Sequence, residues 1–319
     1  MTTTFDLRLA TLSAAYTAGD ITPRQLILGL RDKAAELSPE FNAFIHLMTA
    51  AELEPYLAAL DGKTPAELPL YGVPFAIKDN IDAAGWPTTA ACPEFAYGAE
   101  TDASVVARLR AAGAILIGKT NLDQFATGLV GTRSPHGAVP NSFNPAYVSG
   151  GSSSGSASVV ARGLVPFALG TDTAGSGRVP AGFNNIVGLK PTKGWLPNTG
   201  LVPACRSIDC ISVFALTVAD ALAVADIAGG YDAADAYSRK NPNSARVGMP
   251  AQPRLAVPAN PEFFGDSQNQ AVYEAALGKL RELGAELVEI DFAPFQQLAE
   301  QLYYGPWVAE RTVAVEGVN

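Results

Sequence analysis

Histidine and cysteine are scarce in this sequence of 319 residues, which contains two histidines and three cysteines. So few histidines argue against a histidine-based metal site and against a serine–histidine catalytic pair. His46 lies between Ile45 and Leu47 and is expected to be a packing residue. The three cysteines show no metal-type spacing, which is typical of free thiols in a cytosolic protein.

Long apolar runs and excess positive charge are also missing. No run approaches the roughly 20 apolar residues of a transmembrane helix. The opening residues MTTTFDLRLA lack the basic and apolar regions of a signal peptide. The net charge of −9 argues against nucleic acid or an anionic membrane as a partner. With 48% hydrophobic and 17% charged residues, the composition is that of a well-packed globular protein, for which we expect a cytoplasmic location.

Residues 1–65 are predicted to form a helical segment that packs on the main domain. Within it, Thr22, Pro23 and Gln25 match a capping box with proline at the first helical position. From residue 66 to 319 helices and strands alternate, beginning with a buried strand in YGVPFAIKDN (71–80). This alternation predicts an α/β domain with a mixed, largely parallel sheet covered by helices on both faces.

The last predicted element, residues 296–315, is an apolar helix interrupted by Pro306, where a kink or a restart is expected. After it the chain stops without a terminal cap or linker. We therefore expect the domain to be incomplete at its C-terminal end.

Two common motifs can be set aside. Residues 113–120, GAILIGKT, satisfy the phosphate-loop pattern, but the residues between the glycines form a strand and not a glycine-rich loop. Residues 151–155, GSSSG, satisfy the pattern of a nucleophile elbow centred on Ser153. In enzymes with that elbow the histidine follows the serine, whereas both histidines here precede it.

The centre of the chain holds two glycine–serine clusters, GGSSSGSA (150–157) and TDTAGSGR (171–178), each at the start of a predicted helix. Free backbone N–H groups at such positions stabilise developing negative charge. A serine nucleophile without histidine needs another base, and lysine is a known substitute. Lys78 ends a buried strand, where desolvation lowers the pKa of a lysine. The residues alone leave a second interpretation open, in which Lys78 reaches the surface and pairs with Asp79.

GVPFAIKDN, GGSSSGSA and TDTAGSGRVPAGFNNIVGLKPTKG together resemble the amidase signature family of serine hydrolases. The resemblance implies a Ser–cis-Ser–Lys triad in which Lys78 is the base, Ser152 the bridging serine after a cis peptide bond, and Ser176 the nucleophile. It also implies an α/β amidase signature fold without metal or cofactor. The backbone N–H groups of residues 173–176, which are Thr173, Ala174, Gly175 and Ser176, would form the oxyanion hole. Asp172 would orient this loop, and Ser153 would support the site.

Within the family, TAGSGRVPAGFNNIVGLKPT and ACRSIDCISVFALT are similar to allophanate hydrolases, which implies a small anionic amide, allophanate, as substrate. In that subfamily a tyrosine and an arginine on a late helix bind the carboxylate, which points to Tyr303 and Arg311. Eight helical residues apart, the two side chains can reach one cleft if the helix continues through Pro306. The alternative for Arg311 is a surface pair with Glu310 or Glu316. Gly128 is a further candidate for backbone contact with the substrate.

The resemblance further implies a homodimer, with a C-terminal domain or separate enzymes that process the first product. Two alternatives stay open. The chain could be another amidase or an amidotransferase subunit of the glutamyl-tRNA type, or a non-catalytic fragment with a role in assembly.

Overall fold

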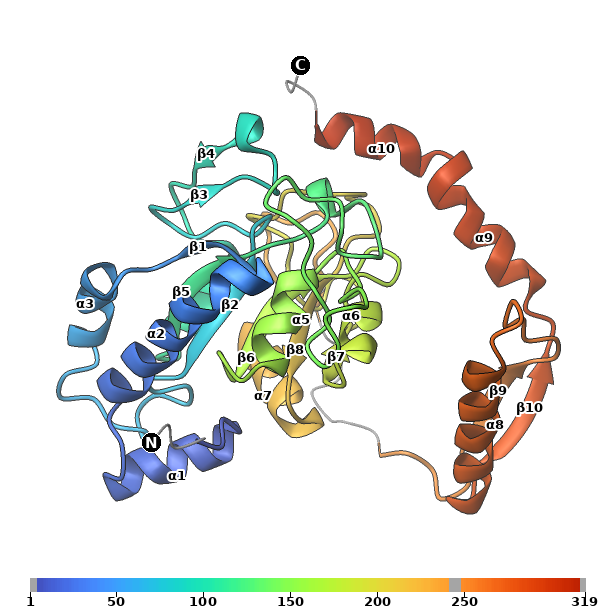
Figure 1. Ribbon diagram of the computed structural model, residues 1–319, viewed down its shortest axis with the longest axis horizontal. Helices are drawn as coiled ribbons and strands as arrows, with labels where there is room; N and C mark the ends of the chain where they lie inside the picture. The colour runs from blue at the N-terminus through green and yellow to red at the C-terminus, as the bar shows by residue number, and fades with distance from the viewer. Residues whose placement is uncertain (1–4, 241–247, 316–319) are drawn as a thin grey trace. The chain divides into compact units, whose positions relative to one another are not determined.

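The computed structural model describes residues 5–240 and 248–315 and divides the chain into two compact units (Figure 1). The first comprises Met1–Asn241 with Glu310–Asn319, and the second comprises Pro242–Ala309. The first 65 residues lie inside the first unit, so the units do not divide where the sequence analysis placed a boundary.

The N-terminal segment contains three helices and one strand, which are α1 (Leu9–Ala18), α2 (Pro23–Phe41), β1 (Phe44–Leu47) and α3 (Ala50–Ala58). The predicted capping box is confirmed, because Thr22 and Gln25 exchange side-chain and backbone hydrogen bonds at the start of α2. The prediction of helices alone missed β1, whose four residues are too few to show a period of two. The strand joins the edge of the main sheet, and His46 packs edge-to-face on Trp86, as its predicted packing role requires.

The first unit is built on a six-stranded mixed sheet in the order β1-β5-β2-β6-β8-β7. Its central strands β5, β2 and β6 run parallel, whereas β1, β8 and β7 pair antiparallel with their neighbours. The predicted α/β architecture with a mixed sheet is thus confirmed. After β1, the strands are β2 (Pro74–Lys78), β5 (Ile115–Thr120), β6 (Phe167–Thr171), β7 (Val187–Leu189) and β8 (Ile211–Ala215).

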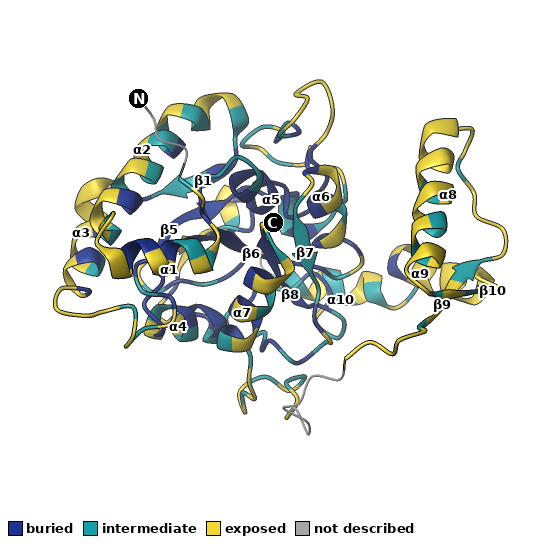
Figure 2. Cartoon of the chain, turned by 90° about the horizontal axis from the view of Figure 1, so that it is seen from below, coloured by how far each residue is buried: buried dark blue, intermediate teal, exposed yellow. Residues whose placement is uncertain are grey.

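The chain leaves β2 to form β5 on one side of it and then returns to form β6 on the other. Because crossovers between parallel strands are right-handed, these opposite moves place α4 (Ser104–Ala111) and α5 (Ser154–Ala161) on opposite faces of the sheet. Figure 2 shows α5 and α6 (Arg178–Phe183) on one face, and α4 with α7 (Val218–Ala228) on the other. The carboxyl ends of β2 and β6 flank the reversal, which is where α/β proteins bind ligands.

Helix α5 is buried along nearly its whole length (Figure 2). Its sequence SGSASVVA allows this, because small side chains let the helix lie against the sheet and the covering loops at once. At Gly155 a Cβ atom would lie 2.3 Å from the carbonyl oxygen of Ala43, so the close approach requires glycine. Apolar side chains such as the stacked pair Phe75 and Phe167, with ring centroids 5.2 Å apart, fill the core. Packing therefore holds the start of α5 in place beside the sheet.

Loops after β2 carry the short strands β3 (Pro87–Thr88) and β4 (Tyr97–Gly98), and two short 3₁₀ turns lie at Pro93–Phe95 and Gln124–Ala126. The phosphate-loop pattern falls inside β5, as its apolar residues predicted. Its lysine, Lys119, is fully buried and forms an ion pair with Asp79 at 3.3 Å.

The second unit is a β-α-β arrangement in which β9 (Arg254–Pro258) and β10 (Glu286–Ile290) pair in parallel and α8 (Ser267–Glu282) connects them. The predicted helix and strand at 269–290 are confirmed. Helix α9 (Ala293–Tyr304) follows, and α10 (Trp307–Ala314) begins after Pro306. No helix in the described ranges combines the length and the apolar character that crossing a bilayer requires.

Candidate active site

Lys78 is the last residue of β2 and is completely buried between β5 and β6. Its Nζ donates hydrogen bonds to the hydroxyl of Ser152 at 2.7 Å and to the hydroxyl of Thr171 at 2.6 Å. Among the described residues it forms no ion pair with a carboxylate. The interpretation of Lys78 as a surface residue paired with Asp79 is therefore wrong. Asp79 is the partner of Lys119 instead.

Burial lowers the pKa of Lys78 from 10.5 to about 7, because the charged amine loses its hydration. The carboxylates of Asp123, Asp209 and Asp172 oppose this effect, but none of them overcomes it. A lysine with a pKa near neutrality is in large part uncharged at pH 7. The amine can therefore accept a proton from a neighbouring hydroxyl.

Ser152 lies in the turn that leads into α5, and the peptide bond between Gly151 and Ser152 is cis. Ser152 is fully buried and faces Lys78, whereas the neighbouring Ser153 faces β6. The Ser153 hydroxyl donates to the carbonyl oxygen of Thr171 at 3.0 Å and accepts from the Thr171 N–H at 3.2 Å. Ser153 thus ties the start of α5 to the end of β6, next to the hydroxyl that Lys78 contacts.

Ser176 lies in the turn between β6 and α6 and is 4% exposed. Its hydroxyl makes a long hydrogen bond of 3.5 Å to the carbonyl oxygen of Gly128, and its own carbonyl accepts from Ser153 N–H at 3.4 Å. In the described part of the chain, no hydrogen bond joins the hydroxyls of Ser152 and Ser176. Catalytic hydrogen bonds are often long before substrate binds and tighten in the complex. The two glycine–serine clusters nevertheless meet at one place.

The turn around Ser176 is organised by Asp172, which is buried at the end of β6. Its carboxylate accepts hydrogen bonds from the backbone N–H groups of Gly175, Gly177 and Arg178, and from the Arg178 side chain. Burial raises the pKa of this carboxyl, but the hydrogen bonds from Arg178 and Gly175 outweigh burial and lower it overall. Asp172 is therefore ionised and holds the loop, in keeping with the orienting role predicted for it.

One of the four predicted oxyanion donors is already engaged. The N–H of Gly175 donates to Asp172 at 2.6 Å, so it is directed into the protein and not toward a substrate. Within the described residues, the N–H groups of Thr173, Ala174 and Ser176 have no hydrogen-bond partner in the protein. The structure thus leaves three candidate donors in place of four.

Tyr303 and Arg311 do not share one helix. The chain breaks at Gly305 and Pro306, because proline has no N–H to continue the helix, and the residues on either side belong to α9 and α10. The geometric prediction based on a continuous helix is therefore wrong. Tyr303 is 56% exposed and belongs to the second unit, whereas Arg311 belongs to the first.

Arg311 contacts the first unit through its Nε, which donates to the sulfur of Cys205 at 3.4 Å. The alternative pairing with Glu310 is not formed, since Glu310 accepts hydrogen bonds from the N–H and hydroxyl of Ser207. Glu316, the other alternative partner, lies outside the described residues. Arg311 therefore lies at the loop that precedes β8.

Several residues at the site were missed in the sequence analysis. Thr171 receives the second hydrogen bond of Lys78, and Asp123 accepts from the N–H groups of Gly131 and Arg133. Asp209 accepts from the hydroxyl of Thr173. The two aspartates occur in loops with no spacing that marks them as buried. Thr171 could have been found, because it directly precedes the aspartate of the second cluster.

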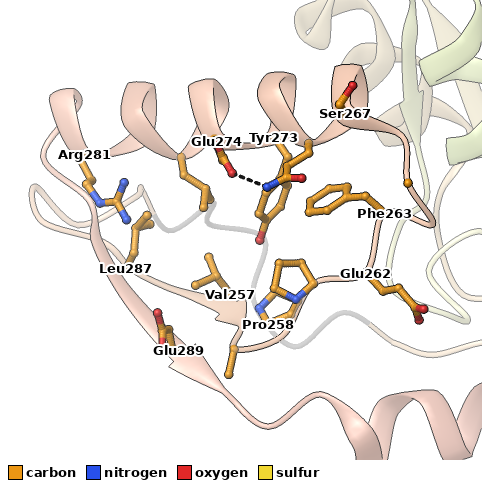
Figure 3. Close-up of a pocket in the computed structure, with 15 residues that line it drawn as sticks. Val257, Pro258, Glu262, Phe263, Ser267, Tyr273, Glu274, Arg281, Leu287 and Glu289 are labelled. Atoms are coloured by element: carbon orange, nitrogen blue, oxygen red, sulfur yellow. Dashed lines mark hydrogen bonds between the residues drawn. The ribbon is translucent and has the colours of Figure 1, made fainter.

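A pocket in the second unit lies between α8 and the β9–β10 pair (Figure 3). Its lining includes Tyr273, Leu277 and Leu287, and its polar side chains Gln270 and Glu274 bond to each other at 2.9 Å. Ser267 lies at its edge without a lysine or histidine among the lining residues. The pocket does not combine a nucleophile with a base. In the described ranges, no group of three or more metal-ligating side chains is gathered anywhere.

Comparison with known proteins identifies the family. The family model described as Amidase matches residues 25–317. The urea amidolyase of Lachancea kluyveri is 52% identical over 286 residues, which cover 89% of this chain and 16% of that protein. The glutamyl-tRNA(Gln) amidotransferase of Chlorobium luteolum is 44% identical in its A-type polypeptide over 267 residues, covering 81% of this chain and 54% of that one.

A solved structure of Kluyveromyces lactis allophanate hydrolase superimposes with a TM-score of 0.92 at 48% identity. The match covers 98% of this chain and 51% of that one, so the chain spans about half the length of this relative and less of the urea amidolyase. The predicted family and fold are confirmed. On the sequence match over most of its length and on the shared architecture, the chain belongs to the amidase family.

Proposed function

We propose that this chain hydrolyses the terminal amide of allophanate and releases ammonia. The observation that most supports a hydrolytic role is the 2.7 Å hydrogen bond from the buried amine of Lys78 to the hydroxyl of Ser152. A lysine that is buried without a carboxylate partner has a strong tendency to be neutral, which is the state a base requires.

In the proposed reaction Lys78 accepts the proton of Ser152, and Ser152 accepts the proton of Ser176. The oxygen of Ser176 then attacks the amide carbon, and the carbonyl becomes an oxyanion. The N–H groups of Thr173, Ala174 and Ser176 would stabilise the oxyanion, each by about 3 kcal/mol in the transition state.

Collapse of this intermediate breaks the bond between carbon and nitrogen. The departing nitrogen takes the proton from the relay and leaves as ammonia, and the acyl group remains on Ser176. Water then attacks the acyl-enzyme, with Lys78 and Ser152 again moving the proton, and N-carboxycarbamate is released. Asp172 and Ser153 take no proton and hold the loop and the start of α5, as their hydrogen bonds indicate.

For the anionic end of the substrate we propose Arg311, whose guanidinium can bind a carboxylate through two parallel hydrogen bonds. Tyr303 and the backbone of Gly128 complete the proposed binding residues, and the carbonyl of Gly128 is already a neighbour of the Ser176 hydroxyl. The similarity to an allophanate hydrolase supports this substrate over other linear amides. A role in a glutamyl-tRNA amidotransferase is the alternative, since a polypeptide of such an enzyme is also a relative.

Ammonia release from allophanate, malonamate and 3-methylbutanamide tests the proposal. The last compound carries an isopropyl group where malonamate has its carboxylate. Ser176→Ala should lower kcat by about 10⁴-fold or more on all three. Ser142→Ala is the matched control, because the Ser142 hydroxyl has no hydrogen-bond partner in the described residues. Normal activity in a folded Ser176→Ala variant would refute the nucleophile.

Arg311→Ala should lower kcat/KM by about 100-fold on the two anionic amides only, since it removes two charge-assisted hydrogen bonds. The exposed residue Arg281 provides a control substitution, Arg281→Ala, in the second unit. An equal loss on the neutral amide would contradict the proposed carboxylate contact and favour the broader amidase function.

We also propose that the chain acts as a homodimer in the cytoplasm, and that a further domain or a separate hydrolase consumes the N-carboxycarbamate. The basis is the resemblance to allophanate hydrolases. Light scattering during size-exclusion chromatography tests the dimer, and a single monomer peak at micromolar concentration would contradict it.

A further inference from the structure

A buried carboxylate, Asp209, lies directly before β8 and is 2% exposed. It accepts a hydrogen bond from the hydroxyl of Thr173 at 2.6 Å. It also accepts from the backbone N–H of Ala204 at 2.9 Å and from that of Cys205 at 3.1 Å. One side chain thereby connects two loops that are more than 30 residues apart in the sequence.

The first of these loops is the turn that carries the candidate oxyanion donors. Asp172 holds the later part of the turn through Gly175 and Gly177, and Asp209 holds its beginning through Thr173. The N–H groups of Thr173 and Ala174, which have no partner in the described residues, lie between the two attachments. Their direction therefore depends on both carboxylates.

The second loop carries the contact with Arg311. Asp209 holds the N–H of Cys205, and the sulfur of the same cysteine accepts from Arg311 Nε at 3.4 Å. In addition, Glu310 binds the N–H and hydroxyl of Ser207 at 2.9 and 2.6 Å. The two Nη groups of Arg311 have no hydrogen-bond partner in the described residues, so they are free to bind a carboxylate.

We propose that Asp209 is a positioning residue that aligns the oxyanion donors through Thr173 and the guanidinium of Arg311 through Cys205. This inference rests on the proposed function and deepens it, since it links the reacting end of the substrate to its anionic end. Asp209 itself touches neither end. Its effect on kcat passes through Thr173, and its effect on the KM of anionic amides passes through Cys205.

Steady-state kinetics on malonamate and 3-methylbutanamide separate the two connections. Thr173→Val keeps the shape and removes the hydroxyl, and should lower kcat about tenfold on both amides, because small misplacements of donors are costly. Cys205→Ala should raise KM about tenfold for malonamate only. Asp209→Asn should produce both effects. Asp235→Asn is the matched control, because Asp235 also accepts backbone hydrogen bonds, from Asn198 and Tyr237, and should remain near the parent.

The double variant Thr173→Val/Asp209→Asn should lower kcat no further than Asp209→Asn alone, because both changes break one connection. Additive losses, or an Asp209→Asn variant that matches the Asp235→Asn control, would overturn the inference. If Asp209→Asn does not fold, the single variants still decide. An unchanged kcat for Thr173→Val, or an unchanged malonamate KM for Cys205→Ala, would overturn it.

Failure of the proposed function looks different, because the parent would then hydrolyse neither amide. The role of Asp209 is in that case measured from the rate at which a fluorophosphonate labels Ser176, since the phosphoryl oxygen would use the same N–H donors. Thr173→Val and Asp209→Asn should slow labelling about tenfold relative to Asp235→Asn. Equal labelling rates would overturn the inference, and a parent that is not labelled at Ser176 would overturn both proposals.

Discussion

Replacing Lys78 with methionine should make the protein more stable at neutral pH while abolishing its proposed activity. The pKa of Lys78 falls from 10.5 to about 7 on folding, a difference of 10.5 − 7 = 3.5 units. At about 1.36 kcal/mol per unit, keeping this amine charged in the folded state costs about 5 kcal/mol. Methionine fills a similar volume and carries no charge, so it removes this cost.

The pH dependence gives the prediction its sign. Below pH 7 both the folded and the unfolded chain bind the proton, and the full penalty is present. Between pH 7 and 10.5 the folded state has lost the proton that the unfolded state keeps, so the penalty shrinks as pH rises and vanishes near 10.5. The hydrogen bonds from Lys78 to Ser152 and Thr171 are lost at every pH, at about 1 kcal/mol each.

Together these effects predict that Lys78→Met is more stable than the parent by about 3 kcal/mol at pH 6 and less stable by about 2 kcal/mol near pH 10.5. Urea denaturation of both proteins at pH 6, 8 and 10 measures the difference directly. Lys63 is exposed, so Lys63→Met has no burial penalty to relieve and serves as the control. A difference between Lys78→Met and the parent that stays constant from pH 6 to 10 would refute the reasoning.

The same lysine predicts that kcat/KM rises with pH through an apparent pKa of about 7, which a pH profile on malonamate measures, and a flat profile from pH 5 to 9 would contradict it. Asp123→Asn removes the carboxylate that most raises the pKa of Lys78, so this limb should shift down by about one pH unit, whereas an upward shift would exclude the electrostatic role. Gly151→Ala places a Cβ 2.2 Å from an oxygen of Asp123 and should reduce both activity and melting temperature, and an unchanged protein would show that the loop can move. Thr22→Ala removes the capping box of α2 and should cost about 1 kcal/mol of stability in urea denaturation without changing kcat, so a loss of kcat would contradict its purely structural role.

Local patterns were sufficient for many elements of the fold. The strand at β2, the capping box at Thr22 and the helix–strand pair α8–β10 all follow from periodicity and from capping residues that act within a few positions. Strand β1 was missed because it is short and depends on pairing with β5 for its backbone hydrogen bonds. The break between α9 and α10 was open in the sequence, since proline inside an apolar helix can produce a kink or a restart.

The two buried lysines show where the sequence by itself stops. Each lies at or near the end of an apolar strand, and their immediate neighbours, Ile-Lys-Asp for Lys78 and Gly-Lys-Thr for Lys119, do not say which one is a base. Only strand pairing and the loops that follow decide, because they place Asp79 beside Lys119 and two hydroxyls beside Lys78. The motifs alone determined the family and the candidate serines. The tertiary structure decided which amine lacks a carboxylate, because burial and distant neighbours set a pKa that no local pattern encodes.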